Sequence, residues 1–543
     1  MWVLPLIQPL NKDFFMIKRH LISCLMLQGA LVFTSLPLYA SATDPCAPEC
    51  RGLCEDDARI EALRARVAKN AACDFGLSLL QDPKNRDLYI LENKQTWRVL
   101  TNQRGDAEDL NHARKKLGYA QMDGNFYAVR PPVTPTDVPV PSPLFGLLRQ
   151  NLPAHMGFNL VGAYDETDLL AWGAGQYQRN FSTSKKDKTF PELYVPNLAE
   201  DRFASVISRV RAITNYRDLI ATSLNQFMPI DGAHLTQDLA NKYGASLETF
   251  VEHDLHTHFR MAWEVGKGSA SRPNVAIMTW APQDQEPVLT LDLVGKGVCF
   301  DTGGHNLKTP SESAATMFAD KGGALAQLML ATLIMEANLP VKVRVANGWV
   351  VNVPGRDAQM QSDIYKTLAG QVENADTDAE GRLVLASILN YLRQNNPAQV
   401  TMTAATLTWA QLVATGKNAG LFHARKSDPF TKHLKKGMRT AKDPMVHHGI
   451  DARFLDELKK ASKRADMVTC TELNGDSARA DAFLRVHASE TTQFAHADIA
   501  CADTGTPGMT PGVENLDMFY VLGAFEAVKT YVESLQSGAS TSS

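Results

Sequence analysis

The sequence predicts an α/β protein with a mostly parallel, mixed sheet flanked by helices in its C-terminal domain, preceded by a smaller, divergent N-terminal domain. Two observations predict this fold. From about residue 213, β-branched runs at 288–294, 341–353 and 400–407 alternate with helix-like segments at 323–338 and 381–393. Strands that alternate with helices of this length favour a parallel sheet covered on both faces. The 543 residues are also enough for two domains or more with large cores.

The N-terminal segment has the pattern of a secretory signal peptide. Basic residues at 18–20 precede a mostly apolar run at 21–38, which is followed by Ala-Ser-Ala42. A basic start, an apolar centre and small residues at the end are typical of a cleaved signal. We therefore expect residues 1–42 to be removed and the mature protein to be periplasmic or secreted. An uncleaved anchor is the alternative, which Gln28, Ser35 and Pro37 disfavour.

Four cysteines lie close together just after this predicted cleavage point: Cys46, Cys50, Cys54 and Cys73. In an oxidising compartment such a cluster favours disulfides, although the pairing stays open. Of the eight cysteines one lies in the signal, and the odd number that remains leaves at least one thiol free. Cys299, inside an apolar strand, is the simplest choice.

The chain divides by composition. Residues 43–130 are predicted to be a cysteine-bearing N-terminal region. Residues 131–143 contain six prolines and are predicted to be an extended linker. Residues 144–212 would complete the N-terminal domain, and residues 213–543 would form the C-terminal domain. No segment after the signal reaches the roughly 18 uninterrupted apolar residues of a membrane span, so none is expected after processing.

Charge and motifs exclude several classes of function. A net charge of -4 and a pI near 6.4 give no electrostatic footprint for nucleic acid. The chain has no His-Glu-x-x-His, no Gly-x-Ser-x-Gly and no phosphate-binding Gly-x-x-x-x-Gly-Lys-Ser/Thr motif. Serine hydrolase and nucleotide-binding functions therefore have no supporting motif.

Three glycine-rich blocks carry the chemistry. They read Val294-Gly-Lys-Gly-Val-Cys-Phe-Asp-Thr-Gly-Gly-His-Asn-Leu-Lys308, Met317-Phe-Ala-Asp-Lys-Gly-Gly323 and Asn374-Ala-Asp-Thr-Asp-Ala-Glu-Gly-Arg382. Carboxylates beside glycines, next to apolar runs, suit a buried cation site. Because ligands bind at the carboxyl ends of parallel strands, the blocks are expected to meet at one edge of the sheet.

The number of carboxylates predicts a site for two metal ions. On an extended segment Asp378 and Glu380, two residues apart, would project to the same side. With Asp301 and Asp320 they bring four negative charges, which two divalent ions would balance. Singly, each could instead be a turn residue or a helix cap. Their occurrence in three blocks of one sheet favours the metal site.

Two lysines belong to the same blocks. Lys296 precedes Asp301 by five residues, and Lys308 follows it by seven. A lysine binds metal only as the neutral amine, whereas a charged lysine can stabilise an oxyanion. Taken alone, both would be surface lysines or salt-bridge partners.

The three blocks resemble the motifs of the leucyl (cytosol-type) aminopeptidases, which are dinuclear metalloaminopeptidases. The resemblance extends from about Arg217-Asp-Leu219 to the C-terminal region. It includes Gly266-Lys-Gly-Ser-Ala270, Ala405-Thr-Leu-Thr408 and His496-Ala-Asp-Ile-Ala500, and so covers the predicted domain 213–543. It implies a hydrolase that removes the N-terminal residue of peptides by means of a metal-activated water.

Carried over by position, the resemblance assigns a role to each site residue. The metal ligands would be Lys296, Asp301, Asp320, Asp378 and Glu380. Lys308 and Arg382 would be catalytic. The substrate-binding residues would be Met317, Thr406, Leu407 and Trp409. The cofactors would be two divalent ions, Zn²⁺ or Mn²⁺, with a bicarbonate held by the arginine, and the assembly would be a homo-hexamer acting on peptides.

Four departures from the family pattern mark this chain. There is one extra residue near Thr309, Lys321 replaces a methionine, Asp376 replaces an asparagine, and Trp409 replaces a glycine. Two alternatives remain open: a dipeptidase of the same family, and a non-catalytic protein that uses the fold for binding or structure. All predicted ligand and catalytic positions are present, which favours the enzyme.

Overall fold

The computed structural model describes residues 199–308, 315–416, 419–443, 445–471, 474–500 and 520–540, together with short segments between residues 76 and 194. The predicted signal peptide, the cluster from Cys46 to Cys73, the proline-rich linker and Thr309 lie outside the described residues.

An eight-stranded mixed sheet forms the centre of the C-terminal part. Its strands follow the order β15 (Met445–His448), β14 (Gly420–Ala424), β17 (Gln493–Asp498), β13 (Val400–Ala405), β9 (Leu289–Asp301), β10 (Val341–Asn352), β8 (Asn274–Trp280) and β7 (Ser246–Val251). The four central strands β17, β13, β9 and β10 are parallel, whereas β14 and β8 run antiparallel to their inner neighbours. The predicted mostly parallel, mixed sheet is confirmed.

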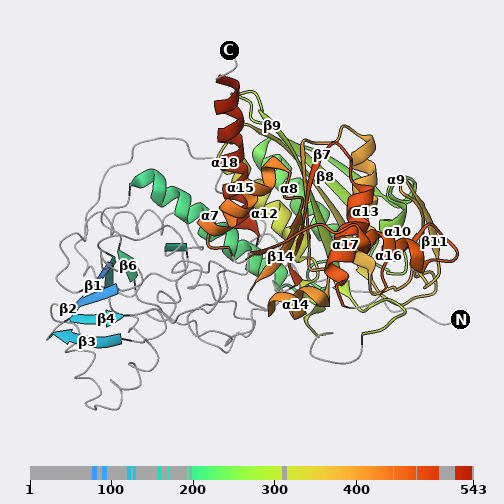
Figure 1. The fold of residues 1–543 in the computed structure, drawn as a ribbon, viewed down its shortest axis with the longest axis horizontal. Helices are drawn as coiled ribbons and strands as arrows, with labels where there is room; N and C mark the ends of the chain where they lie inside the picture. The colour runs from blue at the N-terminus through green and yellow to red at the C-terminus, as the bar shows by residue number, and fades with distance from the viewer. Residues whose placement is uncertain are drawn as a thin grey trace, which may run out of the picture.

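Helices cover both faces of this sheet (Figure 1). One face carries α7 (Glu200–Ile220), α8 (Pro229–Tyr243), α12 (Gly322–Glu336), α15 (Pro429–Thr440) and α18 (Val521–Ser540). The other carries α9 (Glu252–His258), α10 (Arg260–Gly266), α13 (Glu380–Gln394), α16 (Arg453–Ala461) and α17 (Asp476–His487). Each helix layer shares a separate hydrophobic core with the sheet, which explains the long apolar runs of the central strands.

Burial explains where the sequence pattern was informative. The strand β9 is buried along nearly its whole length, and every residue of α12 from Gly322 to Met335 is buried. The predicted strands and helices of this region therefore match the observed β10, β13, α12 and α13 closely, whereas β9 continues to Asp301, beyond the predicted end at residue 294. Cys299 is a buried free thiol in β9, as expected, and Cys470 is also free.

Smaller elements complete the fold. The strands β11 (Ile364–Thr367), β12 (Gly370–Glu373) and β16 (Met467–Val468) form a three-stranded sheet. A six-stranded sheet in the N-terminal part has the order β3 (Tyr119–Asp123), β4 (Phe126–Val129), β2 (Tyr89–Asn93), β1 (Gly76–Gln81), β5 (Gly157–Leu160) and β6 (Glu192–Tyr194). The helix α7 spans the predicted domain boundary at residues 212–213. Within the described ranges, no helix has the length and apolar character to cross a membrane.

The carboxyl ends of the parallel strands meet at one edge of the large sheet. In register, Asp301 at the end of β9 faces Asn352 at the end of β10, and Ala405 at the end of β13 faces Asp498 at the end of β17. Such an edge is where α/β sheets bind ligands. The three glycine-rich blocks lead into or out of it.

Candidate functional site

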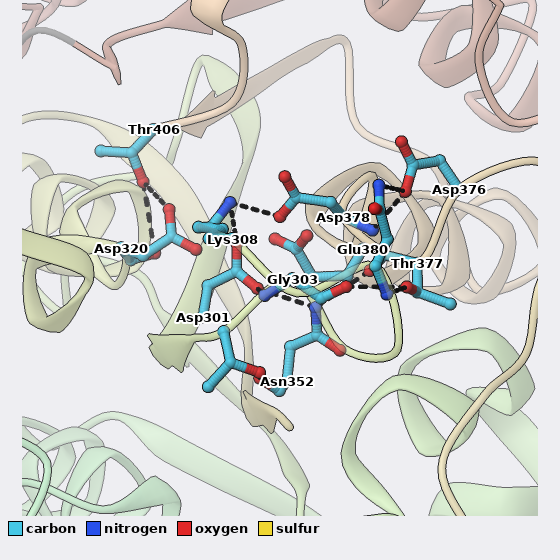
Figure 2. A network of polar contacts seen from close by, with 12 residues as sticks. Asp301, Gly303, Lys308, Asp320, Asn352, Asp376, Thr377, Asp378, Glu380 and Thr406 are labelled. Atoms are coloured by element: carbon cyan, nitrogen blue, oxygen red, sulfur yellow. Dashed lines mark hydrogen bonds and ion pairs between the residues drawn. The ribbon is translucent and has the colours of Figure 1, made fainter. Parts of the chain in front are cut away.

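Three buried carboxylates gather at this edge. One oxygen each of Asp301, Asp320 and Glu380 lies within 4.8 Å of the others. Asp301 ends β9, Asp320 follows the short 3₁₀ helix η2 (Met317–Ala319), and Glu380 is the first residue of α13. Three segments far apart in the sequence therefore bring their acidic residues to one point, as Figure 2 shows.

Lys296 reaches into the same cluster from the middle of β9. Its Nζ lies 2.8 Å from Asp320 Oδ1 and 2.9 Å from Glu380 Oε1, and it donates to the carbonyl oxygen of Thr406 at 2.8 Å. A Cβ at Gly381 would lie 2.6 Å from the Lys296 side chain, so the glycine after Glu380 leaves room for the lysine. Burial alone would lower the pKa of Lys296, but the nearby carboxylates outweigh it and raise that pKa.

Asp301 is fixed by neighbours on both sides. Its Oδ1 accepts hydrogen bonds from Asn352 Nδ2 at 2.7 Å and from the Gly303 amide at 2.9 Å, and its Oδ2 lies 2.8 Å from Lys308 Nζ (Figure 2). Gly303 has a φ of 87°, and a Cβ there would lie 2.2 Å from the Asn306 carbonyl oxygen. The turn after β9 therefore requires glycine at this position.

Lys308 bridges Asp301 and Asp378, and it forms an ion pair with each (Figure 2). Burial alone would lower the pKa of Lys308, but the charges of Asp301, Glu380 and Asp378 hold it above its ordinary value. The ammonium therefore lies on the more exposed side of the carboxylate cluster, with 18% of its side chain accessible.

The local conformation predicted for Asp378 and Glu380 is wrong. Residues 377–378 form a turn and Glu380 opens α13, so the segment is not extended. As a result Asp378 contacts Lys308, whereas Glu380 contacts Lys296. Both still belong to one site, because the charges of Asp301 and Glu380 act on Asp378.

Arg382 is buried in the first turn of α13. Its Nη1 donates to the Thr469 carbonyl oxygen at 2.9 Å and to Asp476 Oδ1 at 3.0 Å, and its Nη2 pairs with Asp476 Oδ2 at 2.5 Å. Of its donors, the buried Nε has no hydrogen-bond partner among the described residues. The guanidinium is therefore held by α17 and the preceding loop.

The charges of the cluster fit divalent cations. Burial raises the pKa of Asp320 and of Glu380, and burial together with Asp301 and Glu380 raises the pKa of Asp378 to about 7. Within the described part of the chain, Asp320 Oδ2 and Glu380 Oε2 are buried without a hydrogen-bond partner. Crowded carboxylates with unpaired oxygens are a donor set that hard or borderline divalent ions bind.

The predicted substrate-binding residues take different positions. Thr406 is buried beside the cluster, and its hydroxyl donates to Asp320 Oδ1 at 2.8 Å. Leu407 is partly buried against the core under α13, and Met317 is half-buried in η2. Trp409 begins α14 (Trp409–Thr415) and is 63% exposed. Thr406 therefore contacts the proposed ligands, whereas the indole of Trp409 lies on the surface.

Two of the residues that depart from the family pattern, Lys321 and Asp376, form hydrogen bonds beside the carboxylate cluster. Lys321 is fully buried, and its Nζ donates to the carbonyl oxygens of Thr222, Ile220 and Phe318. Lys321 therefore links the C-terminal end of α7 to the segment that carries Asp320. Asp376 accepts hydrogen bonds from Asn306 Nδ2 at 2.8 Å and from the Asp378 amide at 2.9 Å, so it shapes the turn before Glu380.

Three further residues of the site did not emerge from the sequence. Asn352 holds Asp301, Asp476 holds Arg382, and Asp498 binds the segment after β13. Asp498 lies in the motif His496-Ala-Asp-Ile-Ala500, which contributed to the family resemblance, but the sequence assigned no role to Asp498. The other two become visible only once the strand register and the position of α17 are known.

The sequence also matches known proteins. The profile of the cytosol aminopeptidase family, catalytic domain, matches residues 214–515, more than half of the chain. A probable cytosol aminopeptidase of Corynebacterium efficiens is 32% identical over 320 residues, which are 58% of this chain and 62% of that protein. The chain thus matches less than two thirds of this relative's length.

Solved structures agree with the sequence comparison. The crystal structure of the cytosol aminopeptidase from Coxiella burnetii has a TM-score of 0.63 and 29% identity, and the match covers 74% of this chain and 85% of that one. The bottromycin maturation enzyme BotP in complex with Mn has a TM-score of 0.67 and 24% identity, covering 80% and 96%, and so shows a common fold. The match over residues 214–515 shows that the chain belongs to the cytosol aminopeptidase family.

Proposed function

We propose that this protein is a metal-dependent aminopeptidase that hydrolyses the N-terminal residue from peptides. The observation that carries the proposal is the meeting of Asp301, Asp320 and Glu380 around Lys296 at the carboxyl edge of the sheet. Membership of the cytosol aminopeptidase family supports the same activity.

Two divalent ions, Zn²⁺ or Mn²⁺, would be held by Lys296, Asp301, Asp320, Asp378 and Glu380. Divalent ions supply Lewis-acid activation of water and of a peptide carbonyl when bound. The protein's own contribution is to fix the donor atoms. Asn352 and the Gly303 amide hold Asp301, while Thr406 holds both Lys296 and Asp320. Such preorganisation is needed for catalysis, because donors must not move during the reaction.

Lys308 is the proposed electrophilic residue. It lies between Asp301 and Asp378 and is less buried than either Asp301 or Lys296. A peptide carbonyl that reaches the carboxylate cluster would have this ammonium beside it. A charged donor there stabilises the negative charge that develops on the carbonyl oxygen during attack.

The bicarbonate that the family resemblance implies is compatible with the donors of Arg382. Asp476 and Thr469 take three of the five N–H groups of the guanidinium, so Nε and the second N–H of Nη2, side by side on one edge, have no bond among those of the described residues. Recognition of a planar anion by arginine usually uses two parallel donors. Arg382 would therefore hold a bicarbonate through this free edge, while its other donors fix the guanidinium to Asp476 of α17 and to Thr469.

The test is release of amino acids from a peptide panel. Protein stripped with a chelator is assayed on dipeptides and longer peptides, with free or acetylated amino termini, before and after addition of Mn²⁺ or Zn²⁺. We expect release only from free amino termini and only with metal. Release restricted to dipeptides would favour the dipeptidase, and metal binding without hydrolysis of any peptide would favour a non-catalytic protein.

Trp409 is expected to restrict the first side chain of the substrate. It lies two residues after Leu407, at the start of α14, and its exposed indole adds bulk where the family pattern has glycine. Trp409→Gly should shift the ratio of kcat/KM values for Leu- and Ala-initiated dipeptides toward Leu. Bulk of this kind is worth about 1–3 kcal/mol, roughly 5–150-fold.

A matched control for Trp409 is available on the same helix. Val413 lies one turn further along α14 and is 70% exposed. Val413→Ala should leave the Leu-to-Ala ratio unchanged. If Trp409→Gly also leaves it unchanged, Trp409 does not set specificity.

We also propose that the protein is exported, on the basis of its N-terminal sequence pattern. The mature chain should begin near Thr43, with disulfides among the cysteines between Cys46 and Cys73. Intact-mass measurement of exported protein, with and without reductant, tests both points. A mass that retains residues 16–42, or four free thiols in that cluster, would contradict the proposal. The homo-hexamer stays a prediction, which light scattering of the purified protein checks.

A further inference from the structure

Asp498 is a buried carboxylate without a role in the chemistry described so far. It ends β17 and faces Ala405, the last residue of β13, in the sheet register. Its Oδ2 accepts the Thr408 hydroxyl at 2.5 Å, and its Oδ1 lies 3.3 Å from the amide nitrogens of Leu407 and Thr408. One side chain thus receives three donors from the segment 406–408.

The segment 406–408 is in turn the inner wall of the proposed metal site. The Thr406 carbonyl oxygen accepts from Lys296 Nζ at 2.8 Å, and the Thr406 hydroxyl donates to Asp320 Oδ1 at 2.8 Å. Thr406 therefore touches two of the proposed ligands at once. Any shift of this segment would move a hydrogen-bond partner of both Lys296 and Asp320.

A second layer holds Asp498 itself. Burial raises the pKa of Asp498, the Ser477 side chain lies near enough to that carboxyl to lower it, and Ser477 Oγ lies 2.9 Å from Nε2 of the buried His423. The imidazole, the hydroxyl and the carboxylate can then form one chain, in which His423 Nε2–H donates to Ser477 and the Ser477 hydroxyl points to Asp498. Burial lowers the pKa of His423 to about 4, which keeps the imidazole neutral in this arrangement.

The same end of α17 supports both sides of the site. Asp476, the residue before Ser477, binds Arg382 of α13, the helix that begins with Glu380. Two adjacent residues at the start of α17 therefore support the site. Ser477 lies beside Asp498, which holds the segment 406–408, and Asp476 binds Arg382 of α13. A buried carboxylate that receives only donors from a wall segment is suited to fix that segment.

We propose that Asp498 is a positioning residue that holds the segment 406–408, and through Thr406 the donors Lys296 and Asp320, in their metal-binding arrangement. This inference rests on the proposed function, because it concerns the same site. Side chains that orient metal ligands from behind typically contribute about 10–100-fold to metal affinity or activity.

The experiment compares Asp498→Ala with a control on the same pair of strands. Thr403 of β13 bonds to His496 of β17 at 2.7 Å, two residues before the Ala405–Asp498 pair, and among the described residues its side chain has no hydrogen bond to the segment 406–408 or to the proposed ligands. Thr403→Val removes a buried hydrogen bond of similar setting. For each variant we measure Mn²⁺ affinity, the thermal midpoint without metal, and kcat and KM on a dipeptide.

Asp498→Ala is expected to weaken Mn²⁺ binding by about 10–100-fold and to lower kcat more than it changes KM. Thr403→Val is expected to lower the thermal midpoint while Mn²⁺ affinity and kcat stay within about twofold of the unsubstituted protein. If Asp498→Ala lowers only the thermal midpoint, the inference is overturned and Asp498 is merely structural.

Two less disruptive variants, both at Thr408, test the same inference if Asp498→Ala does not fold. Thr408→Val removes one of the three donors to Asp498, and Thr408→Ser restores a hydroxyl there. Loss of Mn²⁺ affinity in Thr408→Val with recovery in Thr408→Ser supports the inference, and equal affinities overturn it. Mn²⁺ affinity decides this question even if the unsubstituted protein hydrolyses no peptide, an outcome that would overturn the proposed function alone.

Discussion

Glu380→Gln is expected to abolish peptide hydrolysis and to weaken metal binding sharply. Glu380 is 1% exposed, pairs with Lys296 at 2.9 Å and has one oxygen without a hydrogen-bond partner among the described residues. The substitution keeps the shape of the side chain and removes its charge. Breaking a buried charge pair on one side costs about 3–5 kcal/mol, roughly 10²–10⁴-fold. Asp378→Asn removes charge from the same set and should act in the same direction.

Asp376→Asn provides the control for both variants. Asp376 lies in the same turn and uses Oδ1 to accept from Asn306 and from the Asp378 amide. An asparagine retains that oxygen, so the turn should persist and activity should stay within about twofold, as for a substitution that removes neither a proposed ligand nor a hydrogen bond. Activity and bound metal are measured together for all three variants. A folded Glu380→Gln protein with full activity would falsify the metal assignment.

The fold was predictable because its central elements are buried on both faces. Continuous apolar runs in β9, β10 and β13, and a helix as apolar as α12, leave few alternatives to a covered parallel sheet. The antiparallel strands at the sides were less predictable. β8 and β14 pair with inner strands in an orientation that only the complete topology determines.

The site was predictable as a set of residues but not as a geometry. Acidic residues beside glycines, next to apolar runs, predicted that Asp301, Asp320 and Glu380 would meet, and they do. The extended conformation assigned to residues 378–380 was wrong, since the turn and the helix start place Asp378 and Glu380 beside different lysines. Side-chain direction in a turn depends on backbone dihedral angles, which residue spacing does not give.

The supporting residues depend on contacts across the chain. Asn352 reaches Asp301 because their strands end in register, and Asp498 reaches Thr408 because β17 lies beside β13. These pairs are 51 and 90 residues apart in the sequence. A single asparagine or aspartate at the end of a strand has no local feature that reveals such a partner.

Lys308→Ala is expected to lower kcat by about 10²–10³-fold while KM changes little. Lys308 bridges Asp301 and Asp378 on the more exposed side of the cluster, where a substrate carbonyl would approach. Charge on the carbonyl oxygen develops only in the transition state, so removal of a donor to that oxygen acts on turnover rather than on substrate binding.

Lys308→Ala also removes a positive charge beside the proposed metal ligands, so two controls are needed. Lys366→Ala removes an exposed lysine on β11 and should leave both constants unchanged. Bound metal is measured in parallel, because Lys308 also contacts Asp301 and Asp378. A normal metal content with a large fall in kcat supports oxyanion stabilisation. A fall in kcat that extra Mn²⁺ restores would instead make Lys308 a residue that organises the ligands, and a change confined to KM would make it a substrate-binding residue.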